Sequence, residues 1–257
     1  MMRSQRAINL VASGTALLVM VLAACTENKL GNIVPQGPPA AKASPNMPTT
    51  TITGTVRYVA LGDSTGVGVG AREGGYVARI FKGIEAARRG STLTNLCVSG
   101  ATSDDVLHRQ LERGIQADPN LVTLGIGIND IGHGVGLEEF AQNYDAILKR
   151  LKEGTKATIV VSNLPDISSA PRIPIAMRHE YQQRIITFNQ KLEEVAGRHG
   201  VVVFDVFEIT HEELANHPEY FSADGFHPSD QGYELWAQKM WPTIAGVIGT
   251  VNLGAGL

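Results

Sequence analysis

Between residues 55 and 250, short and continuously apolar runs alternate with longer segments in which apolar residues recur every three or four positions. The short runs are rich in β-branched residues, which is typical of strands. Because they do not alternate with polar residues, we expect strands that are buried on both faces of a sheet. The predicted strands cover residues 56–61, 92–96, 121–126, 157–162 and 201–206.

The periodic segments between these runs predict helices. Strand and helix alternate along the whole domain, so the expected sheet is parallel, with right-handed crossovers and helices on both faces. The sequence therefore predicts one α/β domain, a three-layer α/β/α sandwich around a five-stranded parallel sheet. Helices are predicted over residues 76–89 and 103–116. Apolar residues at helical spacing mark one face of three further helices, within residues 137–151, 181–195 and 233–244.

Small and polar residues follow directly after four of the predicted strands. They are Ser64, Gly100, Asn129 and Asn163. In open parallel sheets, active sites form at the C-terminal ends of the strands. We therefore expect these residues to share one rim of the domain.

Ser64 lies on the turn that leaves the first strand, and Asp224 and His227 lie three residues apart near the C-terminus. A serine hydroxyl becomes a good nucleophile when a base takes its proton, and a carboxylate can orient that base. We expect His227 to be the base for Ser64 and Asp224 to orient the imidazole. The candidate donors to a tetrahedral oxyanion are the N–H groups of Ser64 and Gly100 and the side-chain amide of Asn129.

Four short blocks together resemble the SGNH (GDSL-type) hydrolase family. They are Gly-Asp-Ser ending at Ser64, Gly100 after Asn95, Gly-x-Asn-Asp around Asn129, and Asp-x-x-His from Asp224 to His227. The resemblance spans residues 57–245, with the blocks in the family's order. Thr65 and Cys97 depart from the family pattern, and these departures bear on pocket shape more than on mechanism.

This resemblance implies a flavodoxin-like fold, hydrolysis of carboxylic esters or thioesters, and no metal or other cofactor. It implies that Ser64, Asp224 and His227 form a triad. It also implies that Gly100 and Asn129 complete an oxyanion hole with the Ser64 amide.

Three other interpretations of the same residues are weaker. Residues 62–66 also match the G-x-S-x-G elbow of α/β-hydrolases, but in that fold several strands precede the nucleophile. Residues 66–71 match a loose dinucleotide fingerprint, yet no acidic residue ends the second strand. His211 and His217 are six residues apart, whereas a zincin helix needs a spacing of four. We expect these two histidines to be solvated loop residues.

The remaining polar groups of the blocks have structural interpretations. We expect Asp63 and Asp130 to hold loops by hydrogen bonds and Asp205 to close a strand. Cys97 is expected to be a small buried hydrophobe and not a reactive thiol.

Residues 1–24 have the pattern of a signal peptide, because Arg3 and Arg6 precede an apolar stretch that ends in small residues. Cys25 follows at the cleavage point and resembles the lipidated cysteine of bacterial lipoproteins. The alternative is an uncleaved membrane anchor. Residues 25–54 are rich in proline and predict a disordered tether. We expect residues 251–257 to be a C-terminal tail.

Net charge narrows the range of partners. Without the two arginines of residues 1–24, the chain carries 20 basic and 25 acidic side chains, a net charge of −5. This weighs against nucleic acid, because a basic patch supplies most of the affinity for it. The expected partners are a substrate, which is a small-molecule, lipid or glycan ester, and a membrane to which a lipid on Cys25 anchors the protein.

The sequence thus predicts an exported serine esterase, anchored by lipid in the cell envelope, that hydrolyses lipid, lysophospholipid or simple acyl esters. Two alternatives use the same triad: a carbohydrate O-acetylesterase and an O-acyltransferase. A third is a lipoprotein that binds acylated ligands without turnover. The apolar strip over residues 164–175 is expected either to line an acyl pocket or to pack on the sheet.

Overall fold

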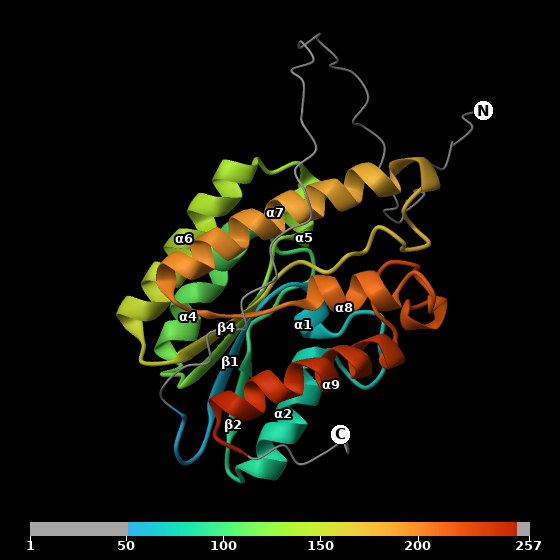
Figure 1. Ribbon diagram of the computed structural model, residues 1–257. Coiled ribbons are helices and arrows are strands. Elements are labelled where there is room, and N and C mark those ends of the chain that lie inside the picture. Colours follow the sequence, from blue (N-terminus) through green and yellow to red (C-terminus); the bar gives the residue numbers. More distant parts are fainter. Residues whose placement is uncertain (1–50, 251–257) are drawn as a thin grey trace, which may run out of the picture. The chain divides into compact units, whose positions relative to one another are not determined.

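Five parallel strands form the centre of the computed structural model, which describes residues 51–250 (Figure 1). The strand order is β2-β1-β3-β4-β5, so the chain begins inside the sheet and builds outward to both edges. Every neighbouring pair is parallel. The strands are β1 (Arg57–Gly62), β2 (Thr92–Asn95), β3 (Leu121–Gly125), β4 (Thr158–Ser162) and β5 (Val202–Phe204).

The long helices cover both faces of this sheet (Figure 1). Val59 and Leu61 of β1 pack into one apolar layer with α4, α6 and α7, while Tyr58 and Ala60 pack into the other with α2 and α9. Since successive side chains of a strand point to opposite faces, burial on both sides requires a continuously apolar strand. The helices are α2 (Tyr76–Ala87), α4 (Leu111–Gln116), α6 (Leu137–Gly154), α7 (Arg178–His199) and α9 (Asp230–Val247).

The predicted three-layer α/β/α sandwich with a five-stranded parallel sheet is therefore confirmed. The first four strands begin and end within one residue of their predicted bounds. Shorter elements lie between these strands and the long helices. They are α1 (Ser64–Val67), α3 (Ser103–Asp105), the π-helix η1 (Val106–Gln110), α5 (Ile128–His133), the 3₁₀-helices η2 (Ile175–Met177) and η3 (Pro218–Tyr220), and α8 (Val206–Glu213).

Besides α1, α5, η2 and η3, which the sequence did not predict, the structure differs from the prediction at two places. The single helix expected over residues 103–116 is divided into α3, η1 and α4. The last residue of η1, Gln110, is buried, and its amide bonds both the N–H and the carbonyl of Gly62, at 2.9 and 2.8 Å. The π-helix thus places the buried side-chain amide of Gln110 against the last residue of β1.

The second difference is helix α8. The predicted strand over residues 201–206 ends at Phe204, and α8 begins at Val206. Asp205 lies between them and caps the helix, because its carboxylate accepts the Glu208 N–H at 3.1 Å. Asp205 was expected to close a strand, and it does so by starting a helix.

No helix within residues 51–250 is long and apolar enough to cross a membrane. The predicted signal peptide, Cys25, most of the tether and the tail at 251–257 lie outside the described residues. They stay predictions.

Candidate active site

Ser64 is the first residue of α1, directly beyond the end of β1. The Asp63 carboxylate caps this helix by accepting the N–H and the hydroxyl of Thr65, at 2.9 and 2.8 Å. The N–H groups in the first turn of a helix have no acceptor in that helix, so the Ser64 N–H is left for another partner. The Ser64 side chain is thus on a fixed turn, and the residue is only 4% exposed.

The three residues of the predicted triad form one hydrogen-bonded chain. His227 Nε2 lies 3.0 Å from Ser64 Oγ, and His227 Nδ1 lies 2.6 Å from Asp224 Oδ2. Ser64 and His227 are 163 residues apart in the sequence, and the fold brings them into direct contact. With Nδ1 protonated and donating to Asp224, the other imidazole nitrogen is an acceptor for the serine hydroxyl.

The Asp224 carboxylate is held on its other side by its own loop. Asp224 Oδ1 accepts the N–H groups of Phe226 and His227 at 2.8 and 2.9 Å, and the Ser222 hydroxyl at 2.9 Å. Partial burial raises the pKa of Asp224, but the hydrogen bonds, chiefly those from His227, outweigh it and hold the pKa far below its usual value. Asp224 is therefore ionised at neutral pH, as an orienting group must be.

The two other predicted oxyanion residues come from neighbouring loops. Gly100 occupies the third position of a turn closed by the Ala101 N–H and the Val98 carbonyl. Its φ of 81° suits glycine there, and the turn's own hydrogen bond does not use the Gly100 N–H. Asn129, at the start of α5, donates one side-chain N–H to the Ala101 carbonyl at 2.9 Å. The amide carries a second N–H, so this bond can orient Asn129 and still leave a donor.

Hydrogen bonds also join these loops to the serine turn. Asn95, at the end of β2, donates its side-chain amide to the Gly66 carbonyl in α1 at 2.8 Å. Asp130 is fully buried and accepts both the N–H and the hydroxyl of Ser103, which ties α5 to α3. Burial raises the pKa of both Asp63 and Asp130. Both aspartates hold loops by hydrogen bonds, as predicted.

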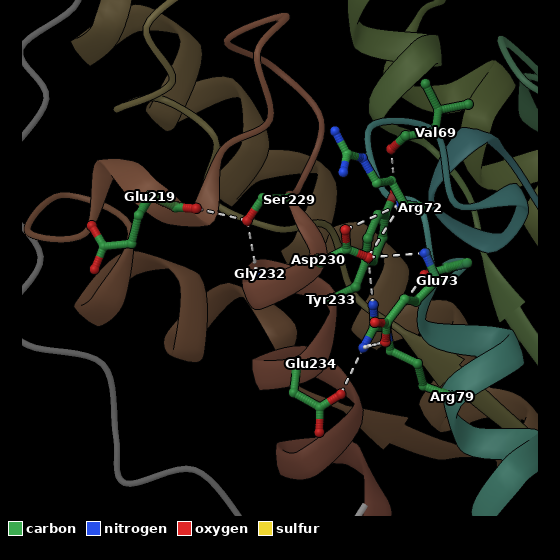
Figure 2. Close-up of polar contacts among 11 residues, drawn as sticks. Val69, Arg72, Glu73, Arg79, Glu219, Ser229, Asp230, Gly232, Tyr233 and Glu234 are labelled. Carbon is green, nitrogen blue, oxygen red and sulfur yellow. Dashed lines mark hydrogen bonds and ion pairs between the residues drawn. The ribbon is translucent and has the colours of Figure 1, made fainter.

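A second network fixes the segment that carries His227 against the segment that carries Ser64 (Figure 2). Asp230, three residues after His227, accepts the N–H groups of Arg72 and Glu73 at 3.2 and 3.0 Å. It also accepts the guanidinium of Arg79 at 2.8 Å, and Arg79 is buried. Asp230 therefore joins the start of α9 to the loop and helix that follow Ser64.

Two further contacts strengthen this junction. The Tyr233 hydroxyl donates to the Val69 carbonyl at 3.0 Å (Figure 2). At Gly70, a Cβ atom would lie 2.7 Å from the Pro228 carbonyl and 2.8 Å from the Ser222 hydroxyl. Glycine at position 70 thus lets the backbone of residues 66–71 pack against the loop that carries His227.

Asn163 does not lie with the candidate site, although its position after β4 predicted that it would. It is buried, and its Oδ1 accepts the N–H groups of Val206 and Phe207 at 2.8 and 2.9 Å. Asn163 thus holds the start of α8. The rim is formed by residues that follow β1, β2 and β3, together with the loop before α9.

His211 was expected in a solvated loop, and the loop is wrong whereas the exposure is confirmed. It lies in α8 with its side chain 54% exposed, and its Nδ1 is 2.8 Å from the buried carboxylate of Asp166. His217 is part-exposed and pairs with Glu219 at 2.9 Å. Within residues 51–250, no three His, Cys, Asp or Glu side chains gather as a metal site would require.

Cys97 packs against the serine turn. A Cβ atom added at Gly66 would lie 2.3 Å from its Sγ. Burial raises the pKa of the Cys97 thiol, so the thiol is protonated at neutral pH. Cys97 is half-buried and not fully buried as predicted, whereas the protonated thiol agrees with the prediction that it is not reactive.

A mostly apolar cavity of about 40 Å³ lies beside Ser64 and His227. Pro165 and Ile167 of the predicted apolar strip line it, whereas Leu164 is in the core and Ile175 is 82% exposed. The remaining walls come from residues that the sequence did not single out, mainly in α8 and α9. They include Ile128, Val206, Ile209, Leu214, Phe226, Leu235 and Trp236.

Comparison with known proteins agrees with this architecture. The chain is 28% identical over 211 residues to the spore germination lipase LipC of Bacillus licheniformis, covering 72% of this chain and 95% of LipC. The solved structure of Axe2, an acetylxylan esterase from Geobacillus stearothermophilus, superposes with a TM-score of 0.64 at 22% identity, over 76% of this chain and 96% of Axe2. The esterase EstA from Pseudoalteromonas sp. gives a TM-score of 0.61 at 20% identity, over 76% of this chain and 99% of EstA.

These structural neighbours share the overall fold of this chain, and at this level of identity they establish the fold alone. The family comparison reaches further. The model of the GDSL-like Lipase/Acylhydrolase family matches residues 60–235, a span that runs from β1 into α9 and includes all four sequence blocks. The chain therefore belongs to the GDSL-like lipase/acylhydrolase family, whose members hydrolyse esters.

Proposed function

We propose that this protein is a serine esterase that hydrolyses carboxylic esters of short acyl groups through Ser64, His227 and Asp224. The observation that carries the proposal is the hydrogen-bonded chain from Ser64 Oγ through His227 to Asp224, at 3.0 and 2.6 Å. An ordered chain of this kind activates a serine hydroxyl that is otherwise a poor nucleophile.

In the proposed reaction, His227 Nε2 takes the proton of the Ser64 hydroxyl while Oγ bonds to the ester carbonyl carbon. The carbonyl oxygen becomes an oxyanion, and the N–H groups of Ser64 and Gly100 and the free amide N–H of Asn129 stabilise it. The imidazolium then gives its proton to the leaving alcohol. Water repeats the same steps on the acyl-enzyme, and Asp224 stabilises the imidazolium in both halves.

Hydrolysis is favoured over transfer to a second alcohol by the exposure of the site. The side chains of His227 and Asp224 are 18% and 35% exposed, so water can reach the imidazole that must activate it. The intact hydrogen-bonded chain also argues against a protein that only binds acylated ligands, because binding needs no such chain.

Short acyl groups are favoured by the small volume of the cavity beside Ser64, about 40 Å³. This also supports a carbohydrate O-acetylesterase as the second candidate, since an acetyl group fits such a cavity. Axe2, which shares the fold, is an acetylxylan esterase, and LipC is a lipase. The two candidate functions, an esterase for short acyl esters in general and a carbohydrate O-acetylesterase, differ in the alcohol part of the substrate.

The proposal is tested with p-nitrophenyl esters of increasing acyl length and with acetylated xylan. Wild-type protein should hydrolyse at least the short p-nitrophenyl esters, and Ser64→Ala should hydrolyse none of them. Release of acetate from xylan at a comparable kcat/KM would favour the O-acetylesterase. Equal turnover by wild type and Ser64→Ala would contradict the proposal.

We further propose that the protein is exported and anchored through a lipid on Cys25. The supporting observations are the signal-peptide pattern of residues 1–24 and the cysteine that follows it. Wild-type protein should partition with membranes in its host, and Cys25→Ser should release it or leave it unprocessed. A soluble wild-type protein whose N-terminus is another residue would remove the claim.

A further inference from the structure

The cavity beside Ser64 and His227 has the position and the chemistry of a binding site for the acyl part of an ester. Its lining includes Ser64 and His227 themselves and otherwise consists mostly of apolar side chains, such as Ile128 and Ile209. An acyl chain attached to Ser64 must lie next to this serine. A hydrocarbon chain gains free energy by leaving water for such surroundings.

The size of the cavity limits the chain that can enter. Its volume of about 40 Å³ is small, since an apolar cavity that binds benzene, a molecule of six carbons, has a volume of about 150 Å³. An acyl group that fits is therefore shorter than about six carbons, on the order of two to four.

Trp236 is the largest side chain in the wall, and it is held rigidly. It is 5% exposed, and its ring stacks on Tyr76 with centroids 4.9 Å apart and planes 5° from parallel. Tyr76 is itself fully buried, at the start of α2. Since α2 and α9 pack against each other through these rings, Trp236 cannot swing aside for a longer chain without opening the core.

We propose that this cavity is the acyl pocket of the enzyme, that it accepts acyl groups of up to about four carbons, and that Trp236 sets this limit. The inference rests on the proposed hydrolysis of short acyl esters at Ser64 and adds to it the upper limit of acyl length and the residue that sets this limit.

The test compares kcat/KM for p-nitrophenyl acetate, butyrate, hexanoate and octanoate. Wild type should prefer acetate or butyrate and lose activity sharply at hexanoate. In Trp236→Leu, the ratio of kcat/KM for hexanoate to that for acetate should rise about tenfold or more, since even one methylene in an apolar pocket changes kcat/KM by about that factor.

The chain offers a matched control in its other tryptophan. Trp241 lies in the same helix and is 8% exposed, but it packs on Gly83 of α2 and does not line the cavity. Trp241→Leu removes the same bulk from the same helix, so the hexanoate-to-acetate ratio should stay at its wild-type value.

If Trp236→Leu fails to fold, Ile209→Ala is a second variant that enlarges the cavity. Ile209 lines the cavity and is only half-buried, so its truncation disturbs the core less. It should move the ratio in the same direction. A wild type that prefers octanoate, or ratios unchanged in every folded cavity variant, would overturn the inference while leaving ester hydrolysis intact. Absence of turnover of every ester by wild type would instead overturn the proposed function.

Discussion

Each residue of the proposed triad is fixed in place by hydrogen bonds from its near neighbours in the sequence. Asp63 caps the turn that carries Ser64, through Thr65. Asp224 accepts two N–H groups of its own loop while it holds the His227 ring. Such local bonds set the direction of a side chain before substrate arrives, and this preorganisation is a large part of catalytic power.

Asn129 is the residue whose role can be tested most selectively. If its free amide N–H binds the oxyanion, Asn129→Ala should lower kcat about a hundred- to a thousandfold, which corresponds to about 2.7–4 kcal/mol. KM should change little, because the hydrogen bond strengthens only as the carbonyl oxygen becomes charged.

The competing role for Asn129 is purely structural, since it also bonds the Ala101 carbonyl. That role predicts a lower melting temperature and wild-type kcat for each folded active site. Kinetics normalised by active-site titration, together with a melting curve, separate the two roles. An unchanged kcat would remove Asn129 from the oxyanion hole.

The depressed pKa of Asp224 predicts a dependence of stability on pH. Because the folded state holds this pKa below the unfolded value of about 3.9, Asp224 favours folding above about pH 4 and loses that contribution as pH falls through the folded-state pKa. The free energy of unfolding in urea should therefore decrease more between about pH 5 and pH 2 in wild type than in Asp224→Asn. His227→Ala, which removes one of the hydrogen bonds, should show an intermediate decrease. Identical pH profiles for all three proteins would contradict this account of Asp224.

At the scale of elements, the junction between α9 and the loop after α1 determines how the two halves of the site meet. Asp230 and Arg79 are 151 residues apart and joined at 2.8 Å, and Arg79 also bonds Glu234 at 2.7 Å (Figure 2). Asp230 is close in sequence to His227, and Arg79 belongs to the helix that follows the serine turn. A shift at this junction would therefore change the distance between Ser64 and His227.

Asp230 should accordingly act as a positioning residue. Asp230→Ala should lower kcat about ten- to a hundredfold, because misplacement of reacting groups by about 1 Å has effects of that size. Asp230→Asn can still accept an N–H bond and should lose less. Labelling by a fluorophosphonate should slow in parallel, since it depends on the same Ser64–His227 geometry.

Glu219→Gln is the matched control for Asp230. Glu219 lies near the same surface, but no dashed contact joins its side chain to the segment after Ser64 in Figure 2. Its carboxylate pairs instead with His217. The kcat and the labelling rate of Glu219→Gln should equal those of wild type. If Asp230→Ala lost stability while its kcat for each folded site stayed at the wild-type value, the junction would be structural only.

The accuracy of each predicted element depends on how clear its apolar pattern is. Four strands and the long helices have continuous or periodic apolar patterns, and their predicted positions agree closely with the structure. Helix α8 is short and follows directly on an apolar strand, so the apolar run was extended across Asp205. Asp205 followed three residues later by Glu208 is a helix-start pattern that could have revealed it.

At the scale of the whole molecule, the hydrogen-bonded chain could be predicted, whereas of the cavity wall the sequence indicated only the part that contains Pro165 and Ile167. Ser64, Asp224 and His227 belong to short blocks whose residue types and spacing carry their chemistry. The cavity is lined by side chains from the serine turn, α5, the loop after β4, α8 and α9. No local pattern marks Trp236 or Ile209 as lining residues, because only the packing of those elements places them there. The Asp230–Arg79 pair was missed for the same reason.

The central claim is that Ser64 is the nucleophile and that the His227–Asp224 pair activates it, and covalent labelling tests this most directly. A fluorophosphonate should modify wild-type protein once per chain, with the adduct on the peptide that contains Ser64. Ser64→Ala should not be labelled, and His227→Ala should be labelled far more slowly. An adduct on another residue, or labelling of Ser64→Ala to the extent of wild type, would contradict the account.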